Sequence, residues 1–227
     1  MKKKILYFLF TLTFLFISCT TVYIPTEVNV PMFRDEHSGT AGISYSMGGA
    51  GLQAGYAFTK QLALIGDVSF LSQKTNDRED FLRYGELGIG YFKILDKAKL
   101  VSFEVFAGSG FASARSKDVQ YNITETGSYY KLFFQPDLGL SFGWIDMIFA
   151  CKMNLIKFTS YSYARKQDKL IEGEPSGMGF EPVFTLRFGT PVFKIKYQLG
   201  ISSVGIINGP AFGREVMVTS FGAVFQF

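Results

Sequence analysis

The chain has 227 residues, of which 48% are hydrophobic and 17% aromatic. Its high content of aromatic residues favours β-structure, since it has 25 Phe and 12 Tyr but only seven Pro. Its formal net charge of +4 includes three lysines among the first four residues, so the rest is close to neutral and carries no basic patch of the kind that binds nucleic acid. One histidine and two distant cysteines exclude a disulfide framework and a metal centre of clustered His and Cys, so we expect neither a metal nor another cofactor.

Residues 1–18 have the pattern of a bacterial export signal. Lys2-Lys3-Lys4 form a basic start, and the apolar run from Ile5 to Ile17 is too short for a helix that spans a membrane. We therefore predict that residues 1–18 are a signal peptide and are removed, which leaves 20 basic and 19 acidic residues.

The end of this segment, Phe16-Ile17-Ser18-Cys19, resembles the lipobox of bacterial lipoproteins, although Phe16 departs from the commoner Leu. The resemblance implies cleavage before Cys19 and attachment of fatty acids such as palmitate to that residue. The alternative is an incidental cysteine near an ordinary cleavage site. Cys151, the other cysteine, falls in a predicted strand, so a disulfide does not account for Cys19.

Residues 19–38 show no sustained period, and Pro25 and Pro31 interrupt them. We predict that they form a lipidated periplasmic tether between the anchor and the first strand. His37 is expected to be a solvated residue of this tether.

Residues 39–227 alternate apolar and polar side chains with the period of two that is typical of strands. Tight connections alternate with longer polar ones near 73–80, 113–127, 159–176 and 204–213, and this alternation favours an up-and-down antiparallel barrel that crosses a membrane. We predict an all-β transmembrane barrel of about ten strands, with eight as the alternative. The expected strands are 39–47, 50–58, 62–72, 81–93, 98–112, 128–142, 145–158, 177–189, 192–203 and 214–227.

The strand at 192–203 shows two distinct faces, since Phe193, Ile195 and Tyr197 alternate with Lys194 and Lys196. A soluble barrel turns its apolar face inward, whereas a membrane barrel turns it toward lipid. The alternation alone does not separate the two. The loop lengths and the last strand favour the membrane, so we expect ionised side chains to line the lumen.

The predicted lumenal face carries five acids and five bases. Unpaired charge in a narrow lumen is costly, so we expect these groups to pair, in particular Lys194, Lys196 and Arg187 with Glu181 and Asp137. Small barrels have interiors that side chains largely fill, which favours a plugged lumen over a general porin. The predicted charge network is Asp67, Glu86, Glu104, Lys131, Asp137, Lys152, Glu181, Arg187, Lys194 and Lys196.

The last strand ends in Ser220-Phe221-Gly222-Ala223-Val224-Phe225-Gln226-Phe227. This stretch resembles the closing strand of bacterial outer-membrane β-barrel proteins, in which a polar residue, a glycine and alternate apolar residues precede a terminal Phe. The resemblance implies that Ser220, Gly222, Phe225 and Phe227 form a signal that the barrel-assembly machinery reads. It also implies contact with outer-membrane lipid, and with ten strands both termini lie on the periplasmic side.

The residues offer little for catalysis, because barrel enzymes of this shape rely on His with Asp, Ser or Glu and this chain has a single His before the first strand. We predict a non-enzymatic, lipid-anchored outer-membrane barrel that is a structural or accessory subunit of an envelope protein complex, or a binder that uses its surface loops. The alternatives are a lipoprotein lipocalin that carries a hydrophobic small molecule, and a narrow solute channel. The sequence names no particular partner.

Overall fold

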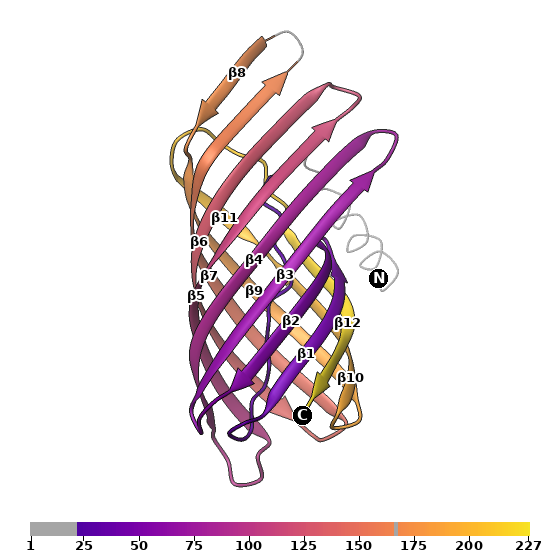
Figure 1. The fold of residues 1–227 in the computed structure, drawn as a ribbon, viewed down its shortest axis with the longest axis vertical. Helices are drawn as coiled ribbons and strands as arrows, with labels where there is room; N and C mark the ends of the chain where they lie inside the picture. Colours follow the sequence, from indigo (N-terminus) through magenta and orange to yellow (C-terminus); the bar gives the residue numbers. More distant parts are fainter. Residues whose placement is uncertain (1–21, 166–167) are drawn as a thin grey trace, which may run out of the picture.

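The computed structural model describes residues 22–165 and 168–227, which form a closed antiparallel β-barrel (Figure 1). Neighbouring wall strands pair in chain order, and the pairing of β7 with β9 completes the circle. The strands are β1 (Gly39–Ser46), β2 (Gly49–Ala57), β3 (Leu62–Lys74), β4 (Arg78–Ile94), β5 (Val101–Asp118), β6 (Ile123–Ser141), β7 (Ile145–Arg165), β8 (Asp168–Gly173), β9 (Ser176–Gly189), β10 (Phe193–Ile201), β11 (Ser203–Asn208) and β12 (Met217–Gln226). Among the described residues, no helix is long and apolar enough to cross a membrane.

Ten of these strands make up the wall. β8 pairs only with β7, and β11 pairs only with β9, where it continues the line of β10, so neither adds to the circumference. The predicted ten-stranded antiparallel barrel is therefore confirmed, and the eight-stranded alternative is wrong.

The wall is much taller on one side than the sequence predicted. β5 runs to Asp118, β6 begins at Ile123 and β7 runs to Arg165, so most residues expected in loops at 113–127 and 159–176 belong to tall hairpins. β1 and β2 have only 8 and 9 residues. Figure 1 shows the result, a wall that is high at β4–β7 and low at β12, β1 and β2. We call the end that holds the C-terminus the lower end, and the opposite end the upper end.

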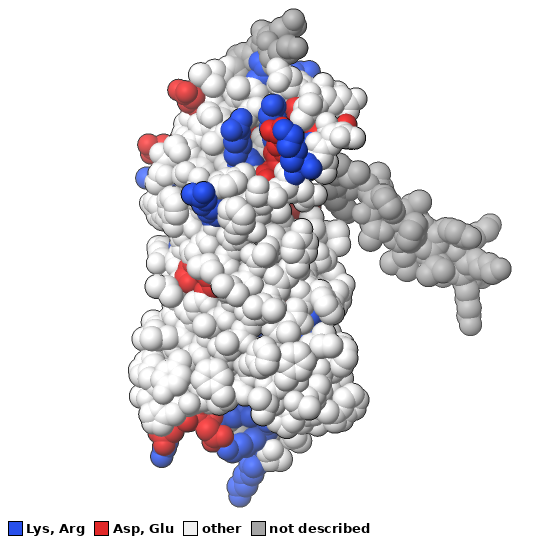
Figure 2. Space-filling view, turned by 45° about the vertical axis from the view of Figure 1, so that its right-hand side comes forward, with Lys and Arg blue, Asp and Glu red and all other residues white. Residues whose placement is uncertain are grey.

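Over the lower part of the barrel, large apolar side chains point outward and ionised ones inward. Leu87, Phe180 and Phe221 are more than half exposed, whereas Glu86 and Lys196 are buried in the lumen. In Figure 2 this region is a broad, mostly uncharged band between charged groups above and below. This is the arrangement of a barrel wall in contact with lipid.

Over the upper part, the polarity of the two faces is reversed. The interior there holds the apolar side chains of Leu82, Tyr129 and Phe158, which pack in one cluster, while Arg83 and Arg115 point outward. The reversal occurs near the cross-strand pair Phe70 and Arg83. The barrel above this level is built like a water-soluble one, with an apolar core and a polar surface.

The C-terminal residue completes the ladder at the lower end. The Phe227 carbonyl accepts a hydrogen bond from the Gly39 N–H at 2.7 Å, and the Phe227 N–H donates to the Gly39 carbonyl at 3.0 Å. Its ring is 74% exposed at the end of the outward aromatic series. β12 thus joins β1 to β10 as the closing strand.

Deleting Phe227 is expected to lower the amount of folded barrel without abolishing export, because it removes both hydrogen bonds to Gly39 and the terminal ring. The measurement is the heat-modifiable fraction on a gel. Phe227→Ala is the matched control, because it keeps the main-chain bonds and loses only the ring. An unchanged folded fraction after deletion would contradict the assembly role of Phe227.

Candidate functional site

The lumen contains the chain's own N-terminal segment. Every residue from Val22 to Phe33 is buried, and Figure 1 shows this stretch as a thin indigo trace inside the barrel. The prediction of an external tether is wrong for residues 22–33. The physical reason is that Val22, Ile24, Val28 and Phe33 give the segment much apolar surface, which is better buried than exposed to water.

The segment enters at the upper end and leaves at the lower end. The N–H groups of Val22 and Tyr23 both donate to the Gly213 carbonyl at 3.1 Å, and the Glu215 N–H donates to the Tyr23 carbonyl at 2.9 Å. At the other end the His37 N–H donates to the Ala57 carbonyl at 2.7 Å. Val22, the first described residue, therefore lies at the end opposite the C-terminus. The prediction that both termini are periplasmic also concerns Cys19, which lies outside the described residues. At the upper mouth, burial raises the pKa of the Glu215 carboxyl.

Ionised wall side chains bind the backbone of the lower half of the segment. Glu104 accepts hydrogen bonds from the N–H groups of Phe33 at 2.6 Å and Met32 at 3.1 Å. Arg187 donates to the Pro31 carbonyl at 3.3 Å and also to the Val30 carbonyl. The buried carboxylate and the two terminal nitrogens of the buried guanidinium thus bind main-chain groups and not each other, while the Arg187 Nε has no partner among the described residues.

Amide side chains bind the middle of the segment in the same way. Gln198 accepts from the Val28 N–H at 2.8 Å and donates to the Val28 carbonyl at 3.1 Å. Gln135 donates to the Asn29 carbonyl at 2.7 Å. These bonds replace the pairing that a neighbouring strand would provide, because an extended backbone buried without partners would be costly.

The segment also supplies charge to the lumen. Glu27 forms an ion pair with Lys196 at 2.6 Å and accepts a hydrogen bond from Ser220 at 2.8 Å. Tyr23 donates through its hydroxyl to Glu181 at 2.7 Å, and Ser202 donates to the same carboxylate at 3.0 Å. The expected pairing of Lys196 with a wall acid is therefore wrong, since its partner comes from the segment.

The ten predicted lumenal residues are all buried, each with 5% or less of its surface exposed. Glu86 lies between Lys152 and Lys131, and the Lys131 ammonium is 3.3 Å from its carboxylate. Lys194 pairs with Asp146 at 2.6 Å, a residue that the sequence reasoning missed. Asp137 accepts from Gln135 at 2.9 Å, so the expected pairs of Lys194 and Arg187 with Asp137 and Glu181 are not those observed.

Apolar packing fixes the segment between these polar contacts. Val28 and Val30 lie in a buried cluster with Ile148 and Val183. Lower down, the Phe33 ring lies 5.5 Å from that of Phe92 and 6.5 Å from that of Phe106, within the range of favourable aromatic contact. A ten-stranded barrel is wider than the eight-stranded size that side chains alone fill, which leaves room for an extended chain.

Other predicted sites lie apart from the segment or outside the structure. Cys19 is outside the described residues. In the predicted assembly signal, Ser220 points inward to Glu27, while the Phe225 ring points outward and lies 4.9 Å from that of Phe193. Gly222 packs so closely on β1 that an added Cβ would lie 2.3 Å from the Ile43 carbonyl oxygen. His37 is exposed, with Nδ1 3.2 Å from the Tyr56 hydroxyl.

The described residues contain no group of three or more His, Cys, Asp or Glu side chains that could hold a metal ion. The lumen instead holds ion pairs and amide groups arranged around an extended peptide. This arrangement is suited to binding a chain segment and to closing the barrel.

No family model matches this chain, and no curated protein matches it. Among solved structures, the N-terminal β-barrel domain of OprF from Pseudomonas aeruginosa aligns over 86% of this chain and all of its own, with 13% identity and a TM-score of 0.38. A KdgM porin, solved with disordered oligogalacturonate, aligns over 84% of this chain and 99% of its own, with 11% identity and a TM-score of 0.36. The translocator domain of the autotransporter NalP from Neisseria meningitidis aligns over 84% and 86%, with 9% identity and a TM-score of 0.36. Likenesses this distant identify neither a family nor a function.

Proposed function

We propose that this chain is an outer-membrane β-barrel that its own N-terminal segment keeps closed, and that it acts as a non-enzymatic scaffold. The observation that carries the proposal is the burial of residues 22–33 in the lumen, held by Glu104, Arg187, Gln198 and Lys196. We expect a lumen occupied in this way to lack a continuous aqueous path. The work of the protein is then done by its outer surface, as a structural or accessory subunit of an envelope complex or as a binder.

The polarity of the wall supports the membrane location. Outward aromatic and aliphatic side chains surround the lower part, and the inside of that part carries buried ion pairs. A lipocalin that carries a hydrophobic ligand in water would have the reverse arrangement. The barrel therefore supports the membrane proposal better than the lipocalin alternative.

The narrow-channel alternative requires the segment to leave the lumen. Departure would separate Glu27 from Lys196 and would leave Glu104 and Arg187 without their main-chain partners. Separating a buried ion pair is costly by several kcal/mol. We therefore propose the closed barrel as the resting state.

The tall hairpins of the upper end are the surface that we propose for a partner. The tip between β5 and β6 exposes Val119 and Tyr121, which are 42% and 53% accessible. Exposed tyrosines such as Tyr121 are among the usual anchors of a protein interface.

The proposal is tested by two measurements on the full-length protein. In planar bilayers it is expected to insert without stepwise conductance. In pull-downs from native outer membranes, a partner retained by wild type is expected to be lost with Val119→Ser/Tyr121→Ser and kept with the matched lower-end variant Leu95→Ser/Leu100→Ser. Open-channel steps from wild type, or retained proteins that do not distinguish the two variants, would contradict the scaffold function.

We also propose that Cys19 is acylated and that the acyl group lies on the outer side. Val22, the first described residue, is at the upper mouth, where its N–H group donates to the Gly213 carbonyl. With the C-terminus on the periplasmic side, the upper end faces outward. Labelling with radioactive palmitate should be lost in Cys19→Ala, and the variant barrel should still insert.

An epitope tag inserted between Thr20 and Thr21 is expected to bind antibody on intact cells, because the chain enters the barrel from the upper end. A tag after Ala98, in the lower turn between β4 and β5, is the matched control and should need permeabilised cells. The reverse pattern of accessibility would contradict the orientation proposed for the N-terminal segment.

A further inference from the structure

A group of basic side chains lies on the outside of β3, β4 and β5, directly above the apolar band. We call Lys74, Arg83, Arg115 and Lys117 the basic cluster. The register places them together, since Lys74 and Lys117 both lie opposite Glu79, and Arg115 lies opposite Phe81. Figure 2 shows Lys and Arg side chains gathered above the uncharged band. The cluster therefore lies at the level where a lipid headgroup would begin.

The cluster carries an excess of positive charge. Lys74 forms an ion pair with Glu79 at 2.6 Å, and the Arg83 guanidinium lies 5.0 Å from the centre of the Phe81 ring. Within residues 22–165 and 168–227, no carboxylate lies within 4.0 Å of a charged nitrogen of Arg83, Arg115 or Lys117. Three basic groups on adjacent strands thus remain available to an anion.

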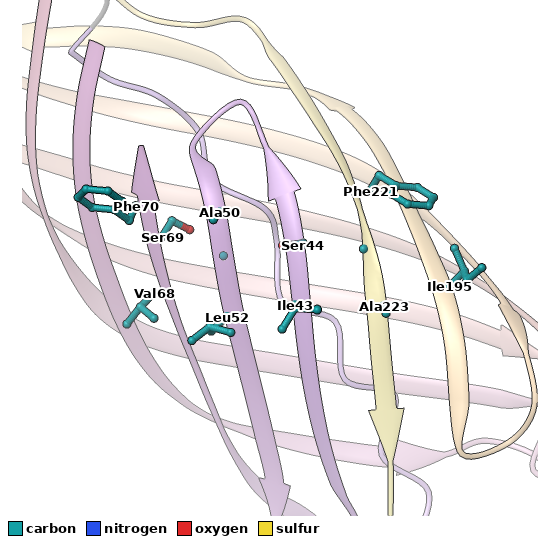
Figure 3. Close-up of a pocket in the computed structure, with 12 residues that line it drawn as sticks. Ile43, Ser44, Ala50, Leu52, Val68, Ser69, Phe70, Ile195, Phe221 and Ala223 are labelled. Atoms are coloured by element: carbon teal, nitrogen blue, oxygen red, sulfur yellow. The ribbon is translucent and has the colours of Figure 1, made fainter. Parts of the chain in front are cut away.

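Two apolar grooves lie below the basic cluster on the lipid-facing wall. The first, of about 720 Å³, runs across β12, β1, β2 and β3. Figure 3 shows Val68 and Phe70 on one side of it and Phe221 and Ile195 on the other, with Ile43 and Leu52 between them. Ala50 and Ala223 provide its floor, at positions where the neighbouring strands carry large side chains.

The second groove, also of about 720 Å³, runs across β2 to β6. Gly85 lies on its floor between Val68 and Phe111, and two residues further up β4 is Arg83. Leu52 and Val68 line both grooves, so they form a ridge between them.

We propose that this face binds one phosphate-bearing lipid of the adjacent leaflet whose headgroup is anionic, with its phosphate at the basic cluster and its acyl chains in the two grooves. The inference rests on the proposed membrane location. Arg and Lys are the usual partners of phosphate oxygens, and basic side chains near a membrane surface attract anionic lipid. The vertical order of charge above groove matches the order of headgroup above acyl chain.

A protein partner fits the same surface less well. The grooves open onto the lipid-facing band, where hydrocarbon is the surrounding medium, and the apolar side chains of Leu52 and Val68 line both of them. The basic cluster is complementary to an anionic group, and the apolar grooves lie directly below it. Both features together favour a single amphipathic molecule with an anionic head.

The experiment measures association of spin-labelled lipids with the full-length barrel in phosphatidylcholine vesicles. Wild type is expected to prefer spin-labelled phosphatidylglycerol over spin-labelled phosphatidylcholine by about fivefold, which corresponds to ~1 kcal/mol. The preference should vanish in Arg83→Gln/Arg115→Gln/Lys117→Gln. It should persist in the matched lower-end control Lys60→Gln/Lys93→Gln/Lys97→Gln. Ala50→Trp, which fills the floor of one groove, should reduce association of both lipids.

Equal losses in the upper and lower triple variants would overturn the proposal, because they would show a general effect of surface charge. A heat-modifiable, membrane-inserted wild type without lipid preference would also overturn it. Failure of the wild type to insert into vesicles at all would instead contradict the proposed membrane location. The circular dichroism of each variant establishes that its barrel has folded.

Discussion

Replacing Lys196 by Met is expected to lower the free energy of unfolding by about 3–5 kcal/mol, the usual cost of removing one partner of a buried ion pair. Lys196 is 1% exposed and pairs with Glu27 at 2.6 Å, so its loss leaves a carboxylate buried with only the Ser220 hydroxyl as a donor. The measurement is urea unfolding of the barrel in detergent micelles, followed by tryptophan fluorescence and circular dichroism.

A double-mutant cycle makes this result specific to the N-terminal segment. Lys196→Met combined with Glu27→Gln should cost less than the sum of the single changes, with a coupling of about 0.5–3 kcal/mol. Lys196→Met combined with Glu181→Gln should be close to additive, because Glu181 bonds to Tyr23 and Ser202. Additivity for Lys196 and Glu27 would mean that residue 27 does not lie beside Lys196 in the folded protein.

The strands of the wall and their two faces could be predicted from the sequence. A period of two places successive side chains on alternate faces, whether water or lipid surrounds the barrel. The period placed Lys194 and Lys196 on one face of their strand, and the loop lengths and the last strand predicted that this face points inward. Both lysines are buried in the lumen. The upper hairpins were harder to predict. There the outward face becomes polar and the inward face becomes apolar. Arg83 is exposed on the outside and Leu82 is buried inside, whereas in the lower wall basic side chains are buried inside and leucines are exposed.

The sequence reasoning did not predict that residues 22–33 fill the lumen. Prolines interrupt this segment, and its side chains face polar and apolar surroundings without a regular period. Glu27 faces Lys196, whereas Val28 and Val30 face an apolar cluster, so neither strand nor tether patterns describe it. A signal was present nevertheless. A solvated tether is expected to be polar, and the stretch from Val22 to Phe33 is rich in large apolar residues.

The composition of the lumenal face does not predict which acid pairs with which base. Five acids and five bases were predicted on the inner face of the wall, and this balance was no reason to expect a further acidic partner for Lys196 or Lys194. The actual partners, Glu27 and Asp146, depend on strand register and on the path of the segment. A shift of one residue in register would move every side chain of a strand to the other face, so these partners are known only once the register is known.

Removing residues 20–33 is expected to convert a closed barrel into a conducting one. The wall is closed by its own ladder, including the pairing of β7 with β9, so it should still fold without the segment. Planar-bilayer recordings should then show steps that full-length protein lacks, with selectivity set by the exposed Lys196, Arg187 and Glu104. A synthetic peptide of residues 22–34 added from the upper side should suppress the steps.

Two controls keep this prediction open to contradiction. Heat-modifiable mobility establishes that the deletion variant has folded. If it has not folded, Gln135→Ala/Gln198→Ala in the full chain is the second variant, because it removes the hydrogen bonds to the main chain of Val28 and Asn29. This variant is expected to show brief openings of the channel. A folded deletion variant without conductance would mean that wall side chains alone collapse to fill a ten-stranded lumen. In that case the segment would be a stabilising core element, because its ion pairs would still contribute to unfolding while the barrel stayed closed without it.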